Sequence, residues 1–195
     1  MAQSITSEIT KTRMCDALKK KMAQKPLNKI TVKEIAADCG LNRQTFYYHF
    51  QDIYDMVEWM FEQEAIEMLR ETVSIHTWQE ACLRLFRYIE KNQDVCLCAL
   101  NSMAGSHLQN FLYHSLEGLV RDVVNQAAEN LDTAEKYRSF LTHYYTITFT
   151  GILVGWLRGD MPGTPDEIIE MLSIAISDNI RGATERFAEQ GEVRP

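Results

Sequence analysis

Apolar residues recur every three or four positions along nearly the whole chain, which is the spacing of amphipathic helices. No alternation of apolar and polar residues typical of strands stands out, and no internal repeat or low-complexity tract does either. The pattern therefore predicts an all-helical protein with roughly nine helices.

Breaks in this pattern locate the expected helices. Pro26 and Asn28 end a first helix over residues 4–24, and a short helical motif follows within residues 30–50. Residues 51–73 are amphipathic and long enough to link a small domain to a larger one. Later helices are expected from Trp78 to a junction at 92–94, over a short apolar stretch at 95–103, and over 108–130, 133–158 and 166–190, with a break at 159–165 and a frayed end at 191–195.

Residues 30–50 carry the most specific local signals, which predict two short helices joined by a tight turn. Thr31 and Glu34 have the spacing of a capping box, in which each side chain binds the backbone amide of the other residue at a helix start. Gly40 lies where the first helix stops and the chain reverses. Such a position favours glycine because the backbone adopts a left-handed conformation.

The second helix of this motif is expected to have one buried and one outward face. Asn42 can cap its N-terminus, and Phe46 and Phe50 lie on the side expected to be buried. The outward face then carries Arg43, Gln44, Thr45, Tyr47, Tyr48 and His49. This is the form of a helix-turn-helix, whose second helix enters the DNA major groove. An ordinary helical hairpin with a polar surface is the alternative interpretation.

These outward residue types suit DNA. Arginine and glutamine make paired hydrogen bonds to guanine and adenine edges, respectively. Threonine, tyrosine and histidine suit phosphate contacts, which position a helix without reading sequence. We therefore expect Arg43 and Gln44 to read bases.

The net charge of −7 is an objection to DNA binding, because basic charge normally supplies much of the affinity. Its distribution removes the objection. Residues 1–50 contain nine Lys and Arg against four Asp and Glu, a net charge of +5, which leaves −12 for the remaining residues. A basic N-terminal region on an acidic remainder fits a protein that touches DNA with one end.

The composition excludes several classes of protein. With 195 residues, 46% of them hydrophobic, the chain can bury a core in one large or two small domains. It contains no run of about 18 apolar residues and no secretory pattern at its N-terminus, so a cytoplasmic location is the default expectation. We find no glycine-rich phosphate loop, nucleophile motif, metal-ligand spacing or paired carboxylates, and we expect no enzyme activity, metal or cofactor.

The cysteines are odd in number and lie mostly at apolar helical positions. We interpret them as buried free thiols, with a redox sensor as the less favoured alternative. They are Cys15, Cys39, Cys82, Cys96 and Cys98.

Residues 9–50 resemble the DNA-binding domain of the TetR family of bacterial transcription regulators, above all in the segments 29–36 and 40–50. The resemblance implies a helix-turn-helix domain over 1–50 and a helical regulatory and dimerisation domain over 51–195, with 51–73 as a linker helix. One departure is that many relatives carry a phosphate-binding lysine near the start of the next helix, where this chain has residues 51–54, Gln-Asp-Ile-Tyr. The expected DNA-binding residues are Thr31, Lys33, Asn42, Arg43, Gln44, Thr45, Tyr47, Tyr48 and His49.

The same resemblance implies a homodimer formed by the last two helices of each chain. A two-fold dimer doubles the contacts that one short recognition helix can make on a palindromic operator. The interface residues expected on those helices are Gly151, Val154, Gly155, Ile169, Leu172 and Ile176.

Members of this family usually hold an effector in the second domain, so the chain is expected to be a repressor released by such an effector. Candidate pocket residues, each equally plausible as core, are Phe86, Met103, His107, Phe111, His114, Tyr144 and Phe149. A looser resemblance links residues 43–47, 50–51, 59–62, 78–79 and 87–93 to regulators of dihydroxyacetone kinase operons. That branch implies the alternative of an activator governed by a partner protein. A helical adaptor that does not bind DNA is the alternative from a different class.

Overall fold

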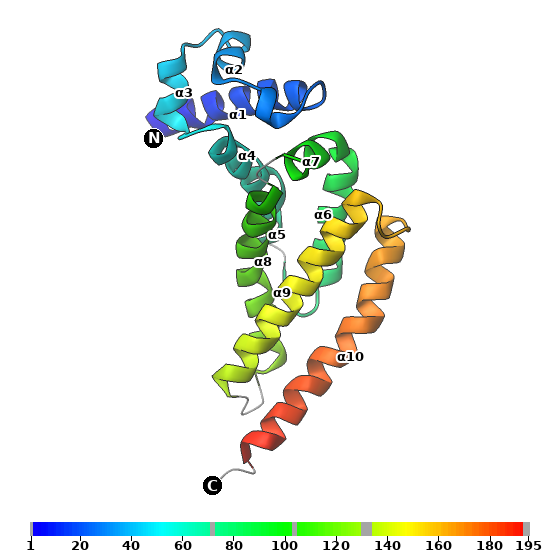
Figure 1. The fold of residues 1–195 in the computed structure, drawn as a ribbon. Coiled ribbons are helices and arrows are strands. Elements are labelled where there is room, and N and C mark those ends of the chain that lie inside the picture. The colour runs from blue at the N-terminus through cyan, green and yellow to red at the C-terminus, as the bar shows by residue number, and fades with distance from the viewer. Residues whose placement is uncertain (1, 71–72, 103–104, 130–133, 193–195) are drawn as a thin grey trace. The chain divides into compact units, whose positions relative to one another are not determined.

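The computed structural model describes residues 2–70, 73–102, 105–129 and 134–192, and within these ranges it contains helices and no β-strand (Figure 1). Nine of its α-helices have seven residues or more, so the predicted all-helical class is confirmed. The α-helices are α1 (Ala2–Met22), α2 (Val32–Asp38), α3 (Arg43–His49), α4 (Ile53–Phe61), α5 (Glu67–Arg70), α6 (Trp78–Lys91), α7 (Gln93–Leu100), α8 (Gly105–Ala127), α9 (Glu135–Arg158) and α10 (Pro165–Glu192), with a 3-10 turn η1 (Leu27–Lys29) and a π-helical turn η2 (Glu62–Ile66).

The chain divides into two compact units. The first comprises residues 1–64 and 92–109, and the second comprises residues 65–91 and 110–195. Helices α4 and α7 both pack on α1, which is why the first unit extends beyond residue 50 and takes in a distant segment. A functional boundary at residue 50 stays a prediction, because the units are defined by packing alone.

The core of the first unit is built from α1, α2, α3 and α4. The buried face of α1 begins at Met14, whereas Ile9, which the helical pattern also places on this face, is 57% exposed. Complete burial of large apolar side chains is worth roughly 1.5–3 kcal/mol each, so this core holds α2 and α3 on α1. Its fully buried side chains are Met14, Leu18, Ile35, Phe46, Met56 and Met60.

The segment predicted as one linker helix over 51–73 is interrupted. Helix α4 ends at Phe61, the π-helical turn η2 follows, and α5 ends at Arg70. Glu64 in this turn forms an ion pair with Lys19 of α1. A π-helical turn inserts an extra residue into the helical ladder, and apolar spacing in a sequence does not register such an insertion.

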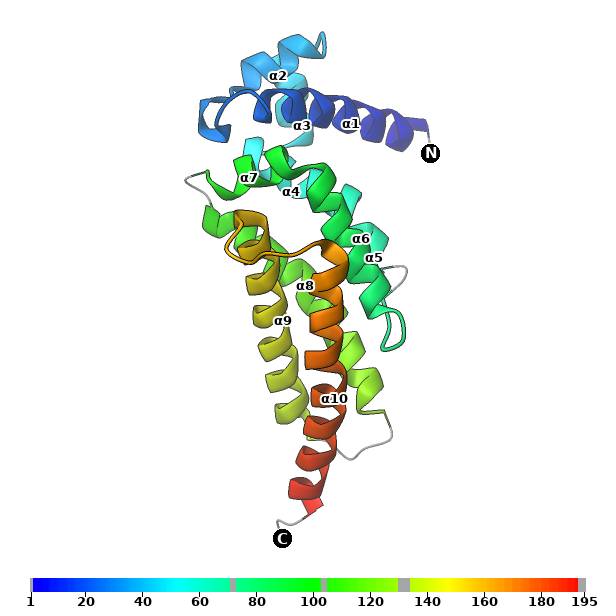
Figure 2. The ribbon, with the colours of Figure 1, turned by 90° about the vertical axis from the view of Figure 1, so that its right-hand side faces the viewer.

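The second unit contains α5, α6, α9, α10 and most of α8, and Figure 2 shows α9 and α10 lying side by side. Gly159 ends α9 in a left-handed conformation with φ of +82°. At the connection between the two helices, the Trp156 Nε1 donates to the Gly163 carbonyl at 2.9 Å. At the other end of the pair, the Tyr137 and Phe187 rings stack with centroids 4.3 Å apart.

The cysteines form no disulfide. Cys15 and Cys96 are buried, and burial raises the pKa of both thiols to about 12, as it does for Cys82. Cys39, Cys82 and Cys98 are partly exposed. Among the described residues, no group of three or more His, Cys, Asp or Glu side chains could hold a metal ion, and no helix there is long and apolar enough to cross a membrane.

Candidate nucleic-acid interface

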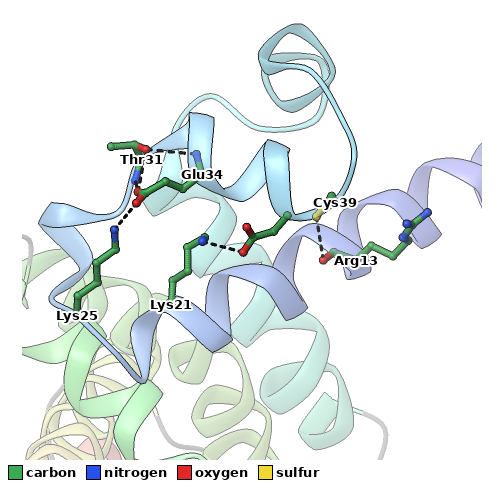
Figure 3. A network of polar contacts seen from close by, with 7 residues as sticks. Arg13, Lys21, Lys25, Thr31, Glu34 and Cys39 are labelled. Atoms are coloured by element: carbon green, nitrogen blue, oxygen red, sulfur yellow. Dashed lines mark hydrogen bonds and ion pairs between the residues drawn. The ribbon is translucent and has the colours of Figure 1, made fainter.

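Helix α2 begins with the predicted capping box (Figure 3). The Thr31 hydroxyl accepts from the Glu34 amide at 3.3 Å, and the Glu34 carboxylate accepts from the Thr31 amide at 2.9 Å. Lys25 adds an ion pair to the same carboxylate at 2.6 Å. The Lys25 ammonium and the Thr31 donors together lower the pKa of Glu34 to about 2.

Replacing Glu34 by glutamine is expected to remove a contribution to stability that depends on pH. Because the folded state lowers the pKa of Glu34 from 4.5, this contribution is complete above that value and is lost as the pH falls towards 2. The difference in melting temperature between wild type and Glu34→Gln should therefore shrink between pH 6 and pH 3. Glu90→Gln, at an exposed position, is the control. A difference that stays constant over this range would contradict the assignment.

The turn between α2 and α3 reverses the chain through a glycine. Gly40 has φ of +66°, a conformation that costs other L-residues roughly 1–2 kcal/mol. The Leu41 amide donates to the Ala36 carbonyl at 2.8 Å and the Gly40 amide donates to the Ala37 carbonyl at 3.1 Å, which is a Schellman motif. The two short helices are therefore held in the arrangement that the local signals predicted.

Helix α3 exposes four of the six residues predicted for its outward face, whereas Thr45 and His49 are half-buried. Asn42 caps it, with its Oδ1 accepting from the Thr45 amide at 2.8 Å and from the Thr45 hydroxyl at 3.0 Å. Phe46 is fully buried and Phe50 is 3% exposed, so the helix is fixed on its inner side. The side chains that stand out into solvent are Arg43, Gln44, Tyr47 and Tyr48, the last of these 79% exposed.

His49 lies at the C-terminal end of α3 and is partly buried. Its Nδ1 lies 3.3 Å from the Ser7 hydroxyl of α1. Burial lowers its pKa, and the nearby Lys11 ammonium lowers it further. The lowered pKa favours the neutral imidazole, which can offer a ring N–H to a phosphate.

The polar groups of Thr31, Asn42 and Thr45 are engaged in helix capping. The Thr31 hydroxyl donates to the Glu34 carboxylate, and the Asn42 side-chain oxygen accepts from the amide and the hydroxyl of Thr45. These residues therefore shape the ends of α2 and α3, whereas Lys33 and Arg43 are exposed and have no ion pair within the described part of the chain.

The basic charge of residues 1–50 is partly neutralised within the first unit. Four of its nine cations form ion pairs, namely Lys11 with Glu8, Lys19 with Glu64, Lys21 with Asp38, and Lys25 with Glu34. Residues 51–64 and 92–109 add six acidic residues and no Lys or Arg, so the whole unit carries a net charge of −1. Attraction to phosphate thus rests on the cations without ion pairs among the described residues, which are Arg13, Lys20, Lys29, Lys33 and Arg43.

The start of α4 offers no open phosphate site. Asp52 caps it by accepting from the Tyr54 and Asp55 amides at 2.7 and 2.9 Å, and Asp55 accepts from the Gln51 amide at 2.8 Å. Two carboxylates therefore occupy the amides that a phosphate would need, in agreement with the missing lysine in this segment.

The second unit contains a small cavity of about 80 Å³. Of the predicted pocket residues whose side chains are described, Phe149 lines it. Phe86 is fully buried beside Phe149 and Trp156, Phe111 is partly buried, and His114 and Tyr144 are exposed. Met103 and the His107 side chain lie outside the described residues. The lining comprises Leu69, Val73, Trp78, Ala81, Cys82, Leu116, Leu119, Val120, Val123, Tyr145, Phe149 and Ile176.

The predicted interface residues divide between the core and the surface of the second unit. Val154, Ile169 and Leu172 are buried within the chain at 5–7% exposure, and Ile176 lines the cavity. A Cβ on Gly155 would lie 3.7 Å from the Met161 sulfur, whereas a Cβ on Gly151 would have no neighbouring atom within 4 Å. Gly151 is thus the predicted glycine that faces open space.

An exposed apolar stripe runs beside Gly151. On α9 it comprises Phe140, Tyr144 and Ile147, each 51–58% exposed, and on α10 Met171 and Ile174 are 52% and 75% exposed. Positions 140, 144, 147 and 151 follow intervals of four, three and four, so they share one helical face. That spacing was visible in the sequence, but apolar residues on every side of α9 concealed which face lies outward.

Comparison with known proteins agrees with this geometry. Residues 15–60 match the family model described as "Bacterial regulatory proteins, tetR family", and residues 76–178 match one described as "Transcriptional regulator C-terminal region". A curated relative, the HTH-type dhaKLM operon transcriptional activator DhaS of Lactococcus lactis subsp. lactis (strain IL1403), is 32% identical over 87 residues. That match covers 45% of this chain and 46% of the relative, slightly less than half of each.

Solved structures share the fold at low sequence identity. The dihydroxyacetone kinase operon activator DhaS has a TM-score of 0.68 and 22% identity, covering 92% of this chain and 98% of that chain. Native NalD, described as the secondary repressor of the MexAB-OprM multidrug efflux pump in Pseudomonas aeruginosa, has a TM-score of 0.62 and 19% identity, covering 87% and 95%. The likeness to these structures concerns the fold.

Proposed function

Because this chain belongs to the tetR family of bacterial regulatory proteins and is a DNA-binding transcriptional regulator, we propose that it acts as a homodimer on a two-fold symmetric operator. Regulators of this type bind DNA and act as dimers. The observation that carries the proposal is the outward face of α3 on a fully buried anchor, Phe46. Since an operator is chromosomal DNA, we place the action of the protein in the cytoplasm.

The exposed residues of the helix-turn-helix divide into two groups. Arg43 and Gln44 at the start of α3 suit base edges, because the N-terminal residues of a recognition helix reach furthest into the major groove. Tyr47, Tyr48, His49 and Lys33 suit phosphate oxygens. Thr31, Asn42 and Thr45 support this surface as caps, and their contacts to DNA stay a prediction.

Lys33→Ala is expected to weaken binding uniformly across DNA sequences. Each lost phosphate contact reduces the magnitude of the slope of log affinity against log salt concentration by about 0.9. Because a dimer loses two such contacts, the magnitude of its slope should fall by about 2. Tyr47→Phe should also weaken binding uniformly, because it removes one hydroxyl donor. The measurement is operator affinity at several salt concentrations, with Lys91→Ala in the second unit as the control. An unchanged salt slope for Lys33→Ala would contradict the phosphate contact.

The dimer is best supported by the exposed apolar stripe on α9 and α10. An exposed apolar row along two adjacent helices is the pattern of an interface that a second copy covers. We propose that α9 and α10 pack against the same helices of the partner as a four-helix bundle, with Gly151 allowing close approach. Val154, Ile169 and Leu172 then support the bundle from inside the chain.

For the effector and the sign of regulation we propose two candidates. The 80 Å³ cavity is lined by apolar side chains, but small-molecule pockets usually measure roughly 300–1,000 Å³. A repressor released by an apolar effector therefore requires this cavity to open. The second candidate, an activator governed by a partner protein, is favoured by the relative described as a transcriptional activator. Transcription in vitro from a promoter carrying the operator, with and without the protein, separates the two signs of regulation.

The decisive experiment is selection of preferred duplexes from random DNA. We expect a palindromic consensus whose affinity falls steeply with salt. Absence of any preference over random duplex at low salt would remove the main support for the proposal and favour a helical adaptor.

A further inference from the structure

A groove of about 420 Å³ lies inside the first unit, between the end of α1 and α7. One wall is formed by Met22, Ala23, Lys25, Pro26 and Asn28, and the other by Asp94, Leu97, Cys98, Asn101 and Ser102. Its volume is within the range of small-molecule sites, unlike that of the cavity in the second unit.

The lining combines apolar and polar side chains. Met22 is 4% exposed and Leu97 is partly buried, so alkyl groups can rest on them. Asn28, Asn101 and Ser102 supply carboxamide and hydroxyl groups around them. This combination suits a small amphipathic molecule with one polar end.

The charges of the groove determine the polar end that it can accept. The Lys25 ammonium is neutralised by Glu34 at 2.6 Å. The Asp94 carboxylate is exposed and has no ion pair among the residues that the structure describes. The uncompensated charge is therefore negative, so the groove favours an ammonium group over a carboxylate or phosphate.

The groove is also connected to the helix-turn-helix. The Cys98 thiol of α7 donates to the Lys25 carbonyl at 3.6 Å, and the Lys25 side chain holds the carboxylate that caps α2 through Thr31. A molecule between Lys25 and α7 would press on the residue that joins α7 to the start of α2.

We propose that this groove is a binding site for a small primary amine with an apolar chain, and that its occupancy changes operator affinity through Lys25 and Glu34. The site is separate from the cavity in the second unit. Its link to operator affinity rests on the proposed function, whereas amine binding itself does not.

Cys98 allows binding to be measured without DNA. It lines the groove, and Cys39, which is also partly exposed, lies outside it in the same unit. The probe is n-hexylamine, with hexanoate and hexanol at equal ionic strength as comparison ligands. The rate at which methyl methanethiosulfonate modifies each thiol is followed by peptide mass spectrometry.

We expect saturating hexylamine to slow modification of Cys98 at least threefold and to leave Cys39 unchanged. Hexanoate should have no effect, and Asp94→Asn should abolish the protection, whereas Asp122→Asn in the second unit should retain it. Equal protection by hexanol, or protection that persists in Asp94→Asn, would overturn the amine assignment. Absence of protection by all three ligands would overturn the site.

The link to DNA is tested separately with the selected operator. Hexylamine should shift operator affinity of the wild type at least threefold and leave that of Asp94→Asn unchanged. Protection of Cys98 without this shift would overturn the coupling while the amine site stands. Failure of wild-type protein to prefer any operator sequence would instead contradict the proposed function.

Discussion

Replacing Ile147 by glutamate is expected to convert the protein from a dimer to a monomer and to lower operator affinity by about 100-fold or more. Ile147 is 51% exposed and lies in the middle of the apolar stripe, between Tyr144 and Gly151. In the proposed four-helix bundle the glutamate carboxylate would be buried against the partner without a counter-charge. A monomer then binds only one half-site of the operator and loses the gain in affinity that two linked recognition helices provide.

Sedimentation at micromolar concentration and operator titration check this prediction together. Asn125→Glu adds the same charge at an exposed position of α8 and is the matched control. Because Ile147 is half exposed, the variant should fold, which circular dichroism can verify. A dimeric Ile147→Glu protein with normal operator affinity would place the interface elsewhere. Wild-type protein that sediments as a monomer would contradict the homodimer itself.

Replacing Arg43 by alanine is expected to lower operator affinity and to change sequence preference. A bidentate contact to guanine is worth about 1–3 kcal/mol of discrimination, and the dimer makes it twice. At one position in each half-site, replacing the base pair should therefore leave the affinity of the variant nearly unchanged, whereas the same replacement should weaken binding of the wild type. Arg43→Lys should recover the charge but only part of the discrimination, because lysine lacks the planar fork of arginine.

Arg13→Ala is the matched control for this experiment. Arg13 is also an exposed cation of the first unit without an ion pair among the described residues. Its loss removes the same charge and should weaken binding to all operators by a similar factor. If Arg43→Ala changes affinity and leaves relative preferences intact, then Arg43 contacts phosphate and Gln44 becomes the main candidate for base recognition.

The helix-turn-helix was predictable because each feature that defines it depends only on residues close together in the sequence. The capping box needs two residues three apart, the turn needs a glycine with positive φ, and α3 needs Asn42 as its cap. All three are present as the spacing predicts. The family resemblance rests on the same segment, and the matched family models confirm it.

Charge pairing was hidden in the sequence. The Lys19–Lys21 run has the composition of a phosphate-binding surface, yet Lys19 and Lys21 form ion pairs with Glu64 and Asp38. These partners lie 45 and 17 positions further along the chain, and only the packing of α1 against α2 and η2 brings them together. The basic surface is therefore smaller than a count of cations indicates.

By itself, the sequence determined the helical class, the helix-turn-helix and the side chains on its outward face, because these follow from spacings of three or four residues. The tertiary structure decided which side of α9 faces the core. Val154 and Ile147 are both apolar, and only the packing of the second unit buries the first and leaves the second exposed. The tertiary structure also placed α7 against α1 and so created the groove. The sequence could not predict this contact, because contacts between distant segments leave no periodic signal in either segment.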